Sequence, residues 1–141
     1  MMPLLVPRRL LPLLCLSLLA CPTVIEESYE VLAQQLDGVW VFHYSEPPLV
    51  TMQALHSGEV LVIDGCLEID GLAVIWHEDQ LATVEDALQR VDQGETVSLS
   101  FGGGGSSLDE GASLEDFPDA ILEHCDPRGV WWASDDEVEF L

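Results

Sequence analysis

The residues best suited to chemistry in this sequence are three consecutive polar ones, His77, Glu78 and Asp79. An imidazole beside carboxylates can bind a metal ion or transfer a proton. The cluster directly follows an apolar run, however, and falls in a predicted turn, where a solvated polar stretch is the ordinary expectation. The other histidines are scattered along the chain, at His43, His56 and His124. We therefore predict no catalytic or metal-binding role for His77 unless the fold gathers other polar groups around it.

A run of four glycines at 102–105 could suggest a phosphate-binding loop. A P-loop also needs a lysine followed by serine or threonine and a helix, and the chain contains no lysine. We predict instead that the glycines begin a flexible acidic loop that extends to Asp119. The carboxylates of this loop lack the ligand spacing of a calcium-binding loop, so we expect only weak association of cations. No metal site and no cofactor is predicted for the chain.

Trp131 and Trp132 are adjacent on a predicted strand near the C-terminus. Successive side chains of a strand point to opposite faces, so one ring should point inward and the other outward. The outward ring could contact a partner or a carbohydrate, because exposed tryptophans are favoured binding anchors. The alternative is that it only covers an edge strand. The sequence does not decide which of the two rings is exposed.

The first 20 residues carry the features of an export signal. Arg8 and Arg9 precede an apolar run at 10–20, and the segment contains no acidic residue. The run is too short for a membrane span, which needs about 20 apolar residues, and Pro12 interrupts it. A basic start, a short apolar run and a small residue before the break are typical of a signal peptide.

The end of this run, LLAC at 18–21, resembles the lipobox of bacterial lipoproteins. The resemblance implies that residues 1–20 are removed and that Cys21 is acylated, which would anchor the mature chain in a bilayer on the extracytoplasmic side of the cell envelope. Pro22 stands where the usual retention signal has aspartate, which favours an outer membrane if the organism has one. The alternative is an ordinary secretory signal in which Cys21 is incidental.

The mature chain would be strongly acidic. Its 26 acidic residues are balanced only by Arg90 and Arg128, which gives a net charge of −24. Nucleic acids are excluded as partners, because phosphate binding needs clustered lysine and arginine. Anionic lipid headgroups would also repel the domain, so it should stand away from the bilayer on its anchor.

Two cysteines, Cys66 and Cys125, remain once Cys15 leaves with the signal and Cys21 is acylated. An even pair in an oxidising compartment predicts one disulfide. The bond would close a loop of about 60 residues and stabilise the domain by roughly 3 to 4 kcal/mol. A metal site is the alternative, although neither cysteine belongs to a C-x-x-C pair.

The rest of the chain has the pattern of short strands with one or two helices. Helical spacing over 24–36 predicts a short amphipathic helix within a tether at 21–37, ahead of a single domain at 38–141. Asp-Gly pairs at Asp64 and Asp70 predict hairpins. Helical spacing recurs over 81–91, where a loop is the competing interpretation. Strands are predicted at 39–44, 60–63 as a buried run, 67–69, 72–76, 97–101, 130–133 and 138–140, with a short helix at 118–122.

Five or six short strands must close on themselves or be covered in order to bury an apolar face. We therefore predict a mainly β fold, a small closed or partly closed barrel of the five-stranded OB-like type, with one or two short helices. Residues 57–134 also resemble a recurrent small β-barrel module of exported bacterial proteins, through SGEVLVIDGCLEID, GETVSLSFGGGG and the late Cys125. That module has no assigned activity, so the resemblance implies only the fold and the disulfide.

LDGVW at 36–40 is similar to the G-x-W opening of calycins. This resemblance would make Trp40 the plug of a ligand-binding barrel and the protein a carrier of a small ligand. Because the signals for chemistry are weak, we predict instead a non-catalytic binding or structural module, held at the envelope by acylated Cys21. Its partner would be an envelope protein or a small ligand, with Trp40, Trp131 and Trp132 as candidate contacts.

Overall fold

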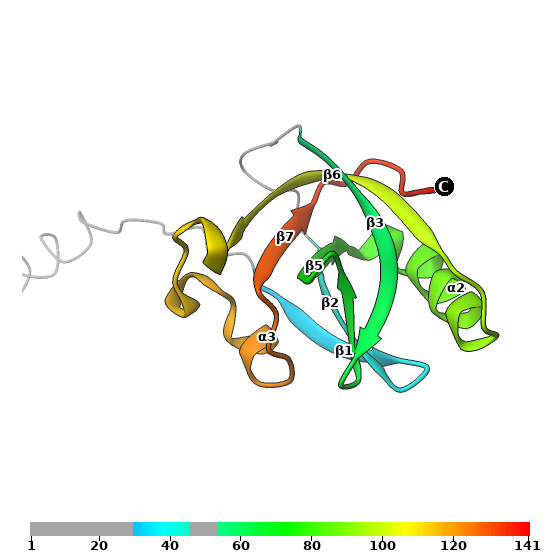
Figure 1. Ribbon diagram of the computed structural model, residues 1–141, viewed down its shortest axis with the longest axis horizontal. Helices are drawn as coiled ribbons and strands as arrows, with labels where there is room; N and C mark the ends of the chain where they lie inside the picture. The colour runs from blue at the N-terminus through cyan, green and yellow to red at the C-terminus, as the bar shows by residue number, and fades with distance from the viewer. Residues whose placement is uncertain (1–29, 46–53) are drawn as a thin grey trace, which may run out of the picture.

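The structure is a computed structural model that describes residues 30–45 and 54–141 (Figure 1). Cys21, the signal segment and most of the expected tether lie outside these residues. The strands are β1 (Leu32–Leu36), β2 (Val39–Tyr44), β3 (Ala54–Ile63), β4 (Cys66–Ile69), β5 (Leu72–His77), β6 (Ser98–Ser107), β7 (Gly129–Ala133) and β8 (Glu139–Phe140). The helices are α2 (Leu81–Asp92) and α3 (Asp119–Leu122), with short 3-10 turns η2 (Glu78–Gln80), η3 (Leu108–Glu110) and η4 (Leu114–Asp116).

The strands form one sheet that curls into a ring. Paired strands lead from β2 through β4, β3, β6, β7 and β5 back to β2, and Figure 1 shows β3 and β6 arching around β2 and β5. The ring is only partly closed, because β2 and β4 share a single register pair, Trp40 with Cys66. The predicted mainly β, partly closed architecture is confirmed. In the described residues the ring passes through six strands, one more than the expected five.

Three Asp-Gly pairs make the hairpins. The predicted ones join β3 to β4 at 64–65 and β4 to β5 at 70–71, and a third joins β1 to β2 at 37–38; both residues of each pair have positive φ. This backbone is that of the two-residue type I′ turn. The helix predicted over 24–36 is therefore wrong in its described part. Leu32–Leu36 is a strand, because the turn folds it back along β2 and that pairing overrides the helical spacing.

The buried run predicted at 60–63 is wrong beyond its first residue. Val60 is 2% exposed, whereas Leu61, Val62 and Ile63 are 40 to 42% exposed. The reason is that β6 pairs with β3 only over 54–59. Residues 61–63 therefore pair only with β4 among the described strands, and they extend past the packed interior.

The glycine run belongs to β6, so the flexible loop predicted from residue 102 onward is wrong over 102–107. Residues 103–105 pair with residues 131–133 of β7. A β-carbon at Gly103 would collide with the carbonyl oxygen of Trp132, and one at Gly105 would collide with that of Val130. The missing side chains thus let the two strands approach closely.

Apolar side chains pack on both faces of the sheet. Successive residues of β2 divide between the two faces, with Val41 in one cluster and Phe42 in the other. Residues 81–91, for which a helix and a loop were both considered, form helix α2. This helix packs Val84, Ala87 and Leu88 into the first cluster. Phe117 and Ile121 cover the second cluster from the segment around α3.

Cys66 and Cys125 form the predicted disulfide across 59 positions of sequence. The bond joins the first residue of β4 to the segment that follows α3. It therefore ties the excursion between β6 and β7, residues 108–128, to the ring.

We expect Gly103→Ala to destabilise the protein by about 3 kcal/mol or more, because the new β-carbon would push the β7 backbone away from β6. Gly94→Ala is the matched control. Its φ is also positive, at +89°, but nothing lies within 4 Å of the added carbon, so only the backbone cost of about 1 to 2 kcal/mol remains. Urea unfolding of the two purified variants measures both losses. Equal losses would contradict the close approach of β6 and β7.

Candidate functional site

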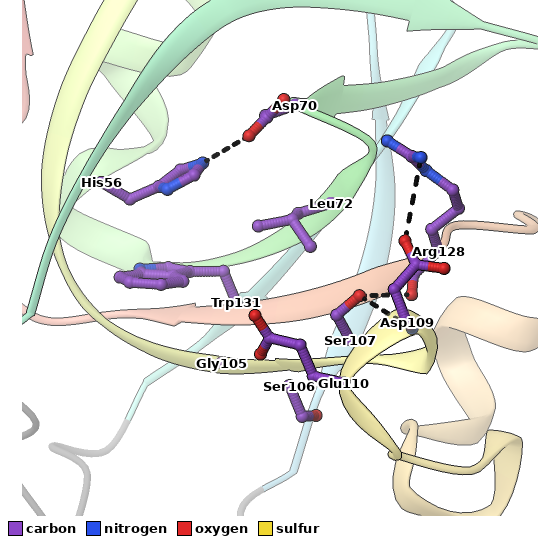
Figure 2. A pocket seen from close by; sticks show the side chains of 10 residues that line it. All are labelled: His56, Asp70, Leu72, Gly105, Ser106, Ser107, Asp109, Glu110, Arg128 and Trp131. Atoms are coloured by element: carbon purple, nitrogen blue, oxygen red, sulfur yellow. Dashed lines mark hydrogen bonds and ion pairs between the residues drawn. The ribbon is translucent and has the colours of Figure 1, made fainter.

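A pocket of about 310 Å³ opens where β3, β7, the β4–β5 turn and the end of β6 meet (Figure 2). We refer to it as the Trp131 pocket. Seven side chains of its lining carry the chemistry: His56, Asp70, Leu72, Asp109, Glu110, Arg128 and Trp131. Two apolar side chains, an imidazole, a guanidinium and three carboxylates therefore face one space. Pockets of this size that combine an aromatic ring with a few polar groups are suited to small ligands.

Trp131 is held by its neighbours on both sides. It pairs with Val74 of β5 and with Gly105 of β6. Its indole Nε1–H donates to the carbonyl of Gly102 at 3.3 Å. The His56 ring lies against the indole, with centroids 5.0 Å apart at 31°. These contacts hold the indole in one orientation at the wall of the pocket.

Backbone hydrogen bonds meet at Arg128, on the opposite side of the pocket. The Arg128 N–H donates to the carbonyl of Gly71 at 3.0 Å, and its carbonyl accepts from the Leu108 N–H at 2.8 Å. The Ser107 hydroxyl donates to the same carbonyl at 3.4 Å and accepts from the Asp109 N–H at 3.2 Å. The β4–β5 turn, the start of β7 and η3 are thus joined at one residue.

Two ion contacts link the charged side chains of the pocket (Figure 2). Asp109 Oδ2 is 3.8 Å from Arg128 Nη1, and Asp70 Oδ2 is 4.0 Å from His56 Nε2. Both separations exceed hydrogen-bond lengths. Within the described part of the chain, His56 Nε2 has no hydrogen-bond partner. His56 and Asp70 therefore do not form a hydrogen-bonded acid–base pair.

Glu68 of β4 is a buried carboxylate, 7% exposed, that interacts with the charge of Arg128. Burial raises the pKa of Glu68 above its ordinary 4.5, Arg128 opposes the rise, and the nearby carboxylates Asp126 and Asp64 reinforce it. Arg128 therefore interacts with Glu68 as well as with Asp109 at the pocket.

His77 lies at the end of β5 and is 8% exposed, so its expected place in a solvated turn is wrong. Its Nδ1 accepts from the Asp79 N–H at 3.2 Å, and its Nε2 lies 3.2 Å from the Ser45 carbonyl oxygen. The Gln80 side chain accepts from the His77 N–H at 2.9 Å. These bonds make His77 the N-terminal cap of η2, which holds the entry to α2.

The three candidate tryptophans occupy different places. Trp131 and Trp132 lie on opposite faces of β7, as alternation predicts, but both are partly buried. Trp131 enters the pocket, while Trp132 packs against Tyr44 with ring centroids 5.7 Å apart. Trp40 stacks on His124, with centroids 3.6 Å apart at 14°.

Sequence reasoning identified Trp131 and missed the residues that surround it. The sequence pattern predicts only a turn at Asp70, and it marks Arg128 only as one of two arginines of the mature chain. His56 and Glu110 carry no local motif. The one available signal was the rarity of Arg128 in so acidic a chain.

Among the residues that the structure describes, no group of three or more histidine, cysteine or acidic side chains is arranged to hold a metal ion. Over the same residues, no helix has the length and apolar character needed to cross a bilayer. Comparisons with protein-family models, with curated proteins and with solved structures found no match to this chain.

We expect Glu68→Gln to stabilise the protein at pH 7 and to have little effect near pH 4. Because the folded-state pKa of Glu68 is raised above 4.5, the folded state binds this proton more tightly than the unfolded state does. The stability contributed by Glu68 is therefore lost as the pH rises from 4.5 through the raised pKa, and glutamine removes that loss. Urea unfolding at several pH values measures the difference from wild type.

The comparison with wild type is needed because His43 acts in the opposite direction. Burial lowers the pKa of His43 below 6.5, partly offset by Glu78, so its contribution is lost as the pH falls. Glu85→Gln on the exposed face of α2 is the control. A difference between Glu68→Gln and wild type that stays constant with pH would contradict the burial of a titrating Glu68.

Proposed function

We propose that the protein is a lipid-anchored module of a bacterial cell envelope that binds a small ligand, without transforming it, in the Trp131 pocket. The observation that carries the proposal is the pocket itself. A fixed indole and an apolar Leu72 face charged side chains across a space of about 310 Å³. Small-ligand sites typically have this composition, with an apolar surface and a few polar groups that orient the ligand.

The walls of the pocket support a binding function. They are joined by backbone hydrogen bonds at Arg128. A preformed wall lowers the entropic cost of holding a ligand.

Two features support a place outside the cytoplasm. The LLAC sequence at 18–21 resembles a lipobox, and the disulfide between Cys66 and Cys125 suits an oxidising compartment. The calycin-type carrier stays an alternative prediction. Trp40, its proposed plug, stacks on His124 and does not line the Trp131 pocket.

Fluorine NMR of the full chain labelled with 5-fluorotryptophan tests the binding proposal. The chain has four tryptophans, so it gives four signals, and Trp131→Phe and Trp40→Phe assign two of them. We expect fragments of a small-molecule library to shift the Trp131 signal and to leave the Trp40 signal in place. Hits that shift only the Trp40 signal would favour the carrier, and an inert Trp131 signal across the library would refute the pocket.

Intact mass of the protein extracted from membranes of a bacterial host tests the anchor. We expect a mass that begins at Cys21 with three acyl chains and increases by two protons on reduction. Cys21→Ser should remove the acyl chains and release the protein from the membrane. An unlipidated wild-type chain in the soluble fraction would refute the hypothesis of a lipid anchor.

A further inference from the structure

The Trp131 pocket carries a negative charge. Three carboxylates, Asp70, Asp109 and Glu110, face it against the single guanidinium of Arg128, which leaves a formal charge of −2 when His56 is neutral. The whole chain adds to this potential with a net charge of −22. Concave sites lined by one sign of charge concentrate ligands of the opposite sign.

Arg128 leaves part of this charge uncompensated. Its ion contact is with Asp109 at 3.8 Å, and it also interacts with Glu68. Asp70 faces His56 at 4.0 Å. In the described part of the chain, no basic group lies within ion-pair distance of Glu110, and Figure 2 shows its carboxylate on the Trp131 side of the pocket. A positively charged ligand would therefore find a carboxylate without a basic partner in the same pocket as the indole.

The apolar walls restrict which cation fits. A bare metal ion prefers oxygen ligands around it, whereas Leu72 and Trp131 offer carbon. An ammonium group on an apolar body matches both kinds of wall. Its charge can pair with the carboxylates and interact with the indole ring, while its body covers Leu72.

We infer that the ligand of the Trp131 pocket is a small organic cation, an ammonium carried on an apolar body. This inference rests on the proposed binding function and assigns its ligand class.

Cyclohexylammonium chloride and cyclohexanol test it, because they share an apolar ring and differ in charge. Each is titrated at pH 7 into the fluorotryptophan-labelled full chain, and the Trp131 signal is followed. We expect the ammonium to bind at least about tenfold more tightly than the alcohol. This advantage should shrink at about 0.3 M NaCl, because the pocket is open to screening.

Matched variants show whether the preference for the ammonium arises in the pocket. Glu110→Gln should weaken binding of the ammonium about two- to fivefold and leave binding of the alcohol unchanged. Glu85→Gln on α2 removes the same charge away from the pocket and should change neither. Equal weakening by the two variants would overturn the inference, because the general field of the protein would then explain the preference.

The remaining outcomes separate the inference from the proposed function. Equal affinity for the two probes, with both shifting the Trp131 signal, would overturn the cationic ligand class and leave the binding function standing. If neither probe nor any library fragment shifts that signal, both would fall.

Discussion

The approach of β6 to β7 is the constraint on which the rest of the domain depends. Residues 102–105 are all glycine, and three of them, 103–105, pair with β7. A β-carbon at Gly103 or Gly105 would meet a carbonyl oxygen of β7. Since β6 is the only described strand that pairs with both β3 and β7, loss of this contact would open the ring. Gly105 also lines the Trp131 pocket.

Arg128 connects the ring to the chemistry of the pocket. Its backbone bonds to the β4–β5 turn and to η3, and its side chain lies so close to Gly71 that a β-carbon there would meet the guanidinium. The guanidinium in turn interacts with Asp109 at the pocket and with the buried Glu68. In a chain with few basic residues, one arginine thus moderates the repulsion among carboxylates that the fold brings together.

Features that depend on short-range sequence could be predicted, and features that depend on register could not. The Asp-Gly turns at 64–65 and 70–71 and most strand positions follow from local patterns, while the disulfide follows from the number of cysteines left in the mature chain. The prediction of a flexible loop at the glycine run is wrong because a flexible loop and a closely packed strand both favour glycine. Only the presence of a partner strand distinguishes the two cases. The prediction of a helix at Leu32–Leu36 is wrong because its apolar spacing suits a helix, whereas the Asp-Gly turn that follows folds it into a hairpin. The pocket was missed because its residues, from His56 to Trp131, meet only through pairings of β3, β6 and β7.

The disulfide lies at the junction of β2 and β4, where the ring is only partly closed. Strands β2 and β4 share one register pair, Trp40 with Cys66, so backbone pairing there is weakest. Cys66 bonds to Cys125, and the Trp40 ring stacks on His124, the residue next to Cys125. Both contacts come from the excursion at 108–128, which also supplies Asp109, Glu110 and Arg128 to the pocket. The disulfide that reinforces the contact between β2 and β4 therefore also holds the far end of the segment that forms one wall of the pocket.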